Sequence, residues 1–292
     1  MAPSRIVLGI VSTPDRAEIV VARGLEVIWR AREAPLHLIF NQSASHRIND
    51  LVAETGADIV GIGLAGLHDD ATADRLEQAI RSQTPAQLVV GDDTEVAQFG
   101  AFAGGPGIVV LGNTGSNAFG RNADGVAARA GGYGHNFSDD GSAYWVGAEA
   151  LRAATRSYDG RGPKSRELEE AAVVTFGSPL RVLMNRFVEQ PPDPSLIARL
   201  APVVGALTDD VSVQIIEEAA TQLIGHVTAL RRDLGDIPVS MYGPMFDIPL
   251  IKERFAAGTG AVQPKAPIEM SAVYLALYAQ PGRSRGWEDR TA

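Results

Sequence analysis

The chain has 292 residues, of which 45% are hydrophobic and 21% charged, and its formal net charge is −9. This length suits about two domains of roughly 100–200 residues each, and the composition is ordinary for a globular protein. No basic tract occurs, which argues against nucleic acid as a main partner because phosphate contacts need clustered Lys and Arg. Since the sequence has no cysteine, disulfides, thiolate nucleophiles and cysteine-held iron–sulfur clusters are excluded.

The sequence predicts neither a signal peptide nor a membrane span. A strand-like apolar run begins at Ile6, without the long apolar core and cleavage site of a signal peptide. No stretch approaches the roughly 18 consecutive apolar residues that a spanning helix needs. We therefore expect a cytoplasmic protein without a membrane partner.

The first part of the chain alternates strands and helices. β-Branched runs predict short strands over Ile6–Val11 and Ile19–Ala22, and a third strand, Glu26–Arg30, follows an Arg23-Gly24 turn. The short connections imply antiparallel hairpins. The elements predicted next are a helix over Ser43–Thr55, a strand over Ile59–Leu64, a helix over Asp70–Arg81, a strand over Leu88–Val90 and a helix over Thr94–Phe102.

The same order restarts after a glycine-rich break at Gly104–Gly107. Three further strands are predicted over Ile108–Leu111, Asn117–Gly120 and Val126–Ala130, followed by a helix over Ser142–Arg156. Strands that alternate with helices indicate an α/β sheet covered by helices, and the repetition predicts two related lobes. The remaining predicted elements are helices over Arg166–Val174, Ser178–Phe187 and Val211–Leu234, a strand over Ile237–Met241, and helices over Ile248–Ala257 and Met270–Ala279.

Polar and glycine residues concentrate in Gly112–Trp145. Glycines let a ligand approach the backbone closely, and hydroxyl, amide and carboxylate groups suit a ligand with many hydroxyls. Tyr133 offers an aromatic face for stacking. The alternative is that the acids only cap a helix and the glycines only form hairpin turns, and composition does not decide between the two. The polar residues in question are Thr114, Ser116, Asn117, Asp139 and Asp140.

Four motifs here resemble those of the BadF/BadG/BcrA/BcrD ATPase family, which includes N-acetylglucosamine kinases. Gly112–Asn117 (GNTGSN) resembles the family's G-T-G-S-N turn, Gly131–His135 (GGYGH) its G-G-W-G-H, Ser138–Trp145 (SDDGSAYW) its G-D-E-G-S-A-Y-W, and Asp159–Pro163 (DGRGP) a loop of bacterial members. The resemblance implies an actin/hexokinase-like ATPase fold with two ribonuclease H-like lobes, over residues 1–106 and 107–292. It also implies that the last helix, about 270–280, packs back on the first lobe, and that a homodimer is to be expected.

A fifth motif, Gly91–Ala101 (GDDTEVAQFGA), resembles the family's N-D-x-x-x-A-x-x-G-A. Aligning the two puts Asp93 on the family's catalytic aspartate, whose carboxylate takes the proton from the attacking sugar hydroxyl. Asp92 takes the place of the family's Asn. The alternative is that Asp93 is the N-cap of the helix predicted from Thr94, and a cap at a strand end also points into a cleft.

The resemblance further implies a sugar pocket. Within it, Asp139 is expected to bind sugar hydroxyls, and Tyr133 replaces the family's Trp. His135 is expected to be structural and Glu149 a solvated helix position. The implied substrate-binding residues are Thr114, Gly115, Asn117, Gly132, Tyr133 and Asp139.

The nucleotide side departs from the family pattern. The family's first phosphate loop reads like D-G-G-G-T-K-S, whereas Gly9–Arg16 reads GIVSTPDR, with Val11 at the acidic place. Larger residues also replace family glycines within Tyr242–Phe246 and Glu269–Leu277. The candidates for nucleotide contacts are Ser12, Thr13, Arg16 and Gly243, and the candidate for the metal is Asp15.

Two functions stay open at this point. The first is an ATP- and Mg²⁺-dependent kinase of an amino sugar, such as N-acetylglucosamine or glucosamine, or of a related polyol, with Asp93 as general base. The second is an ATP-independent, cofactor-free sugar-binding protein that acts as a sensor or regulator, or an enzyme that uses Asp93 and Asp139 as an acid/base pair. The family's electron-transfer activators hold an iron–sulfur cluster through cysteines, so their function is excluded.

Overall fold

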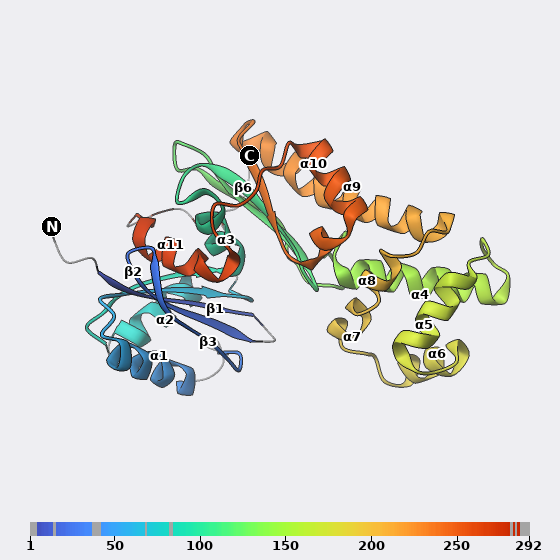
Figure 1. Ribbon diagram of the computed structural model, residues 1–292, viewed down its shortest axis with the longest axis horizontal. Coiled ribbons are helices and arrows are strands. Elements are labelled where there is room, and N and C mark those ends of the chain that lie inside the picture. Colours follow the sequence, from blue (N-terminus) through green and yellow to red (C-terminus); the bar gives the residue numbers. More distant parts are fainter. Residues whose placement is uncertain are drawn as a thin grey trace.

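The computed structural model describes residues 5–13, 16–36, 42–67, 69–81, 84–280, 283, 285 and 286. Two sheets organise these residues (Figure 1), the first with strand order β3-β2-β1-β4-β5 and the second with order β8-β7-β6-β9. The strands are β1 (Ile6–Ser12), β2 (Ala17–Arg23), β3 (Glu26–Glu33), β4 (Ile59–Leu64), β5 (Gln87–Asp92), β6 (Gly107–Gly112), β7 (Ser116–Arg121), β8 (Ala127–Gly131) and β9 (Val239–Tyr242).

The two sheets begin in the same way. In the first, β1, β2 and β3 pair antiparallel, and β4 and then β5 add parallel to β1. In the second, β6, β7 and β8 pair antiparallel and β9 adds parallel to β6. Short hairpins allow only antiparallel neighbours, and the parallel strands follow crossover helices. This arrangement confirms the predicted pair of related α/β lobes.

The helices of the first lobe cover its sheet. They are α1 (Gln42–Thr55), α2 (Asp70–Arg81) and α3 (Asp93–Phe102). Residues of α1 and α2, including Ile48, Leu51 and Ile80, are buried against Leu8 and Ile62 of the sheet. β4 is buried along its whole length, as expected for a central parallel strand with both faces covered.

Helices dominate the second lobe, on the right of Figure 1. The longest described helix is α9, which buries Ile216, Leu223, Val227 and Leu230 on one side. No helix among the described residues is long and apolar enough to cross a membrane. The helices of this lobe are α4 (Ala143–Asp159), α5 (Arg166–Phe176), α6 (Leu180–Glu189), α7 (Pro194–Ala198), α8 (Ala201–Val204), α9 (Asp210–Leu234) and α10 (Pro249–Thr259), with the 3₁₀ turn η1 (Pro244–Asp247). The 3₁₀ turn η2 (Ile268–Met270) and helix α11 (Ser271–Tyr278) follow and contact the first lobe.

Helix α11 lies on the first sheet although it comes near the end of the sequence (Figure 1). It contacts β1, β4 and α3. Glycines allow this approach, since a Cβ at Gly61 would clash with the carbonyl oxygen of Ala272 and one at Gly100 with the Ser271 hydroxyl. Helix α11 therefore stabilises the first sheet. The limits of the lobes at residues 106 and 107 stay a prediction.

Candidate functional site

The turn between β6 and β7, Gly112–Ser116, is fixed to the start of α4. The carbonyl oxygens of Asn113 and Thr114 accept hydrogen bonds from the N–H groups of Ala143 and Tyr144, at 3.0 and 3.1 Å. The first N–H groups of a helix have no partner within the helix, so the turn supplies partners that water would otherwise provide. The helix thereby holds the turn in one position.

The Asp139 side chain packs against this turn. Its Oδ1 accepts a hydrogen bond from the Ser116 N–H at 3.3 Å, and a Cβ at Gly115 would lie 2.8–2.9 Å from its carboxyl atoms. Burial raises the pKa of Asp139, against the opposing effect of the Ser116 bond. The suggestion that Asp139 merely caps a helix is wrong, because the cap of α4 is Ser142, whose hydroxyl accepts from the Trp145 N–H at 3.1 Å.

Two other predicted sugar-binding positions meet next to the turn. Asn117 on β7 is paired with Gly131 on β8. Gly132 follows with φ of +80°, and a Cβ there would lie 3.2 Å from the Asn117 Cβ. The Tyr133 side chain is 78% exposed, so its ring is open to a ligand. The structure therefore brings Asn117 and Gly132 together, next to an accessible aromatic ring.

Asp92 and Asp93 lie where β5 ends and α3 begins. Asp92 has extended backbone angles, and its carboxylate accepts a hydrogen bond from the Glu95 N–H at 2.7 Å. The N-cap is therefore Asp92, and the alternative that assigned this role to Asp93 is wrong. Asp93 is the first residue of the helix and half-buried, and it accepts a hydrogen bond from the Thr94 hydroxyl at 3.3 Å.

Asp92 links the two lobes. Its buried carboxylate forms an ion pair with Arg129 of β8. Burial raises the pKa of Asp92 to about 7, although Arg129 acts in the opposite direction. Gly131 lies two residues beyond Arg129, about 7 Å further along the strand at roughly 3.3 Å per residue. The start of α3, with Asp93, is therefore held beside the strand that leads to Gly132.

A second ion pair lies within the same turn of α3. Glu95 is fully buried, and its Oε1 accepts from Arg121 of β7 at 3.1 Å. Neither Arg121 nor Arg129 is among the site residues predicted from the sequence. An arginine in a short strand has the pattern of a solvated position, so nothing in the sequence marked these two as buried.

The candidate phosphate-contacting residues lie in the turn between β1 and β2. Ser12 is buried, and its hydroxyl donates to the Leu36 carbonyl at 3.3 Å and accepts from the Leu36 N–H at 3.0 Å. The Thr13 N–H and hydroxyl donate to the Arg16 carbonyl at 2.9 and 3.1 Å. The Arg16 guanidinium pairs with Glu18 at 2.7 Å. Each of the three candidates therefore already has a hydrogen-bond or ion-pair partner within the protein.

Gly243, the other nucleotide candidate, lies against the β6–β7 turn, Gly112–Ser116. Its φ is +111°, and a Cβ there would clash with the Asn113 side chain and the Gly112 carbonyl. Only glycine fits such a position. Asp15, the metal candidate, lies outside the described residues. Within the part of the chain that the structure describes, no group of three or more His, Cys, Asp or Glu is arranged to hold a metal ion.

Comparisons with known proteins identify the family. Residues 20–271 match the BadF/BadG/BcrA/BcrD ATPase family. The chain belongs to this family. It is 36% identical over 180 residues to the N-acetylmuramic acid/N-acetylglucosamine kinase of Clostridium acetobutylicum, a match that covers 58% of this chain and 56% of that protein. It is 28% identical over 134 residues to the N-acetyl-D-glucosamine kinase of Dictyostelium discoideum, covering 44% and 42%. The chain thus matches about half the length of these curated relatives.

Solved structures agree on the fold of this BadF/BadG/BcrA/BcrD family member. The Chromobacterium violaceum protein described as a candidate N-acetylglucosamine kinase superimposes with a TM-score of 0.75 at 23% identity, over 93% of this chain and 98% of that one. A ROK family glucokinase from Streptomyces griseus, solved with glucose and AMPPNP, superimposes with a TM-score of 0.58 at 15% identity, over 95% and 100%. At such identities the likeness supports the two-lobed actin/hexokinase-like fold.

The family's description implies that ATP binds, so the residues of the β1–β2 turn can be checked for whether they could contact a phosphate group. Arg16 and Glu18 form a partly exposed pair, and such pairs contribute only about 0–1 kcal/mol, so a phosphate can replace Glu18 at little cost. The bonds of the Thr13 hydroxyl are exposed as well. Ser12 does not fit, because its hydroxyl is buried with both bonds made. Thr13 and Arg16 therefore fit a phosphate group.

Proposed function

We propose that this member of the BadF/BadG/BcrA/BcrD family is a kinase of an amino sugar, such as N-acetylglucosamine, glucosamine or N-acetylmuramic acid, or of a related polyol. The observation that carries the proposal is the ion pair between Asp92 and Arg129, which joins the start of α3 to β8. A sugar bound at Asn117 and Gly132 then faces the first turn of α3, where Asp93 is half-buried. The names of the curated relatives support the choice of substrate class.

In the proposed reaction Asp93 takes the proton from the sugar hydroxyl that attacks phosphorus. Phosphoryl transfer depends mainly on positioning and charge stabilisation, so a fixed carboxylate next to the hydroxyl is the main demand on the protein. Asp139 accepts hydrogen bonds from other sugar hydroxyls, and Tyr133 stacks on the sugar or its N-acyl group. ATP, as its Mg²⁺ complex, would supply the γ-phosphoryl group and leave as ADP, and Thr13 and Arg16 are the described residues that would contact its phosphates.

A second candidate function is favoured by one specific observation at the β1–β2 turn. Val11 is buried where the family pattern has an acid, and Ser12 is fully bonded to Leu36. Both features reduce what the turn offers to a nucleotide. The alternative is therefore a protein that binds the sugar without using ATP, as a sensor or as an enzyme of another class.

The test is ATP-dependent phosphorylation of a panel of amino sugars by the wild type and by D93N. Loss of a general base lowers kcat by about 10²- to 10⁴-fold, while sugar affinity stays within a few-fold because the hairpin side is untouched. D124N removes an exposed carboxylate of the β7–β8 turn and serves as the control, with unchanged kcat.

Two outcomes contradict the proposal in different ways. Phosphorylation that persists in D93N excludes Asp93 as the base. Sugar binding by the wild type without any phosphorylation, and without binding of a non-hydrolysable ATP analogue at millimolar concentration, excludes the kinase and leaves the second function.

A further inference from the structure

Three residues near the end of the described chain form what we call the C-terminal strap: Arg283, Arg285 and Gly286. They lie beyond residues 20–271, the part that matches the family. Both arginine side chains are only 11% exposed. Long cationic side chains are seldom so deeply buried unless they are paired, so the strap makes specific contacts.

Arg283 holds the first turn of α3. Its Nε donates to Glu95 Oε1 at 2.8 Å and its Nη2 to the Val90 carbonyl at 2.8 Å. Glu95 is fully buried, and its backbone N–H donates a hydrogen bond to the Asp92 carboxylate. Arg283 therefore fixes both the end of β5 and the beginning of the helix, on either side of Asp93.

Arg285 connects α2 with β8. Its guanidinium donates to Asp70 at 2.7 Å and to Asp74 and Glu77 at 3.3 Å. Its backbone carbonyl accepts from Arg129 Nε at 2.8 Å. Arg129 is the residue whose guanidinium also pairs with Asp92. The strap thus holds the arginine that joins the two lobes.

Gly286 shows how close the strap backbone lies to β8. Its φ is +71°, and a Cβ there would lie 3.1 Å from the Ala128 nitrogen. A side chain at this position would be strained and crowded. The strap therefore follows the β8 backbone directly beside Arg129.

We infer that the C-terminal strap is a positioning element for Asp93. The two charged neighbours of Asp93 in the cap and first turn of α3 are each held by arginine: Asp92 by Arg129, and Glu95 by Arg121 and Arg283. The strap supplies one of these arginines and seats another. It thereby fixes the Asp93 carboxylate relative to the hairpin that carries Asn117 and Gly132. The catalytic consequence rests on the proposed kinase function, whereas the structural one does not.

The test combines local hydrogen exchange with kinetics in R283A and R285A. Without the strap contacts the Glu95 N–H, bonded to Asp92, opens more often, and we expect it to exchange at least about tenfold faster, with the change confined to the first turn of α3 and β5. Misplacement of the base by a fraction of an ångström lowers kcat by about tenfold or more. The KM for the sugar stays within about twofold, because the hairpin residues are unchanged. R283K keeps a cation and restores part of the protection.

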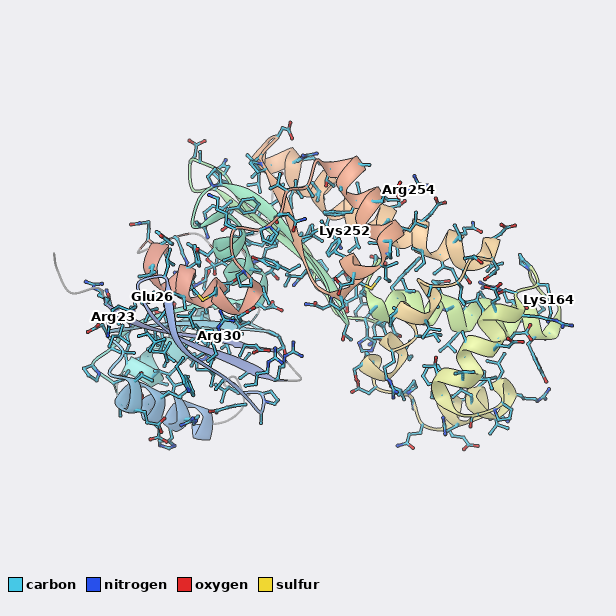
Figure 2. All side chains as sticks on the ribbon, in the orientation of Figure 1. Arg23, Glu26, Arg30, Lys164, Lys252 and Arg254 are labelled. Carbon is cyan, nitrogen blue, oxygen red and sulfur yellow. The ribbon has the colours of Figure 1, made fainter. Side chains whose placement is uncertain are left out.

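The matched control is R254A. Arg254 of α10 also forms an ion pair at 2.7 Å, with Glu217, but its side chain is 52% exposed. Figure 2 shows it on the outer side of the second lobe, away from α3 and α11. Exchange in α3 and kcat should both match the wild type in this variant.

The outcomes separate the strap from the proposed function. Unchanged exchange in the first turn of α3 overturns the inference, whether or not the wild type is a kinase. Faster exchange spread over the whole chain also overturns it, since the strap would then only stabilise the fold. If the wild type phosphorylates no sugar, the proposed function fails while the exchange experiment still decides the structural inference. If the wild type is active, kcat within twofold of wild type in both variants overturns the catalytic consequence.

Discussion

Two turns occupy equivalent places in the two lobes, because each joins the first strand of its sheet to the second. The turn of Gly112–Ser116 is bonded to the start of α4 and backed by Asp139. The turn between Ser12 and Ala17 is held by the bonds of Thr13 to Arg16, which are exposed, and Arg16 pairs with Glu18. Packing fixes the first of these turns, whereas exposed bonds that a ligand can replace hold the second.

The difference predicts different responses to mutation. Where packing fixes a position, a small change of shape has a large effect, since the surroundings cannot adjust. Where exposed polar contacts dominate, water and neighbouring side chains replace what is lost, and effects are small. Variants of the Gly112–Ser116 turn should therefore change ligand affinity strongly, whereas variants of the β1–β2 turn should change it weakly.

The largest effect is expected for G115A. The added Cβ would lie 2.8–2.9 Å from the carboxyl atoms of Asp139, so either the turn or the carboxylate must move. Loss of one hydrogen bond to a charged group weakens sugar binding by about 10- to 100-fold, measured by calorimetric titration.

The control for G115A is G225A, on the exposed side of α9, where an added Cβ meets nothing within 4 Å. Gly→Ala at such a helical position stabilises by up to about 1 kcal/mol. It should leave sugar affinity unchanged. Equal sugar affinity in G115A and the wild type would show that Asp139 and the turn are not tightly packed, which removes the contrast between the two turns.

Much of the fold was predictable because periodic apolar runs decide it. β4 and α2 begin and end at the predicted residues. β8 lies one residue later than predicted, since its sequence AARAG has no β-branched residue to mark it and Val126 is 49% exposed. The short helices α7 and α8 were not predicted, because four or five residues carry too little periodicity.

The site was predictable only where contacts are local in sequence or belong to a motif. The motif positions Asn117 and Gly132 lie together because β7 and β8 form a hairpin. The pairing of Asp92 with Arg129 and of Glu95 with Arg283 joins residues from different parts of the chain. Tertiary packing alone creates such pairs, so no local pattern indicates them.

An intermediate effect, with a defined pH dependence, is expected for Asp139. Burial raises its pKa above the ordinary 3.8, so sugar affinity, which needs the carboxylate, should fall as the pH is lowered through this raised pKa. The contribution of Asp139 to the free energy of unfolding should change in the opposite direction and increase as the pH is lowered. Because the folded state holds the proton more tightly than the unfolded state, the contribution of Asp139 is fully present below about pH 3.8 and is lost as the pH rises through the raised pKa.

D139N tests both parts. Asn tolerates the positive φ of +64° at this position, so the turn should keep its shape. We expect sugar affinity to fall about tenfold at pH 8 and to become independent of pH, as charged hydrogen bonds are stronger than neutral ones. If the variant keeps the pH dependence of the wild type, another group controls binding on this side.

The smallest effect is expected at the β1–β2 turn. If Arg16 leaves Glu18 to contact a phosphate, R16A should raise the KM for ATP by about fivefold or less, because the contact is exposed and water competes for it. R32A is the matched control, since Arg32 pairs with the same Glu18 at 2.9 Å from the neighbouring strand.

E18Q should act in the opposite direction and lower the KM for ATP, because it weakens the competing partner of Arg16. An unchanged KM in both R16A and E18Q would mean that the turn takes no part in nucleotide binding. The contacts of Arg16 with Thr13 and Glu18 would then remain when a nucleotide is present. The two equivalent turns would differ in function as well as in packing.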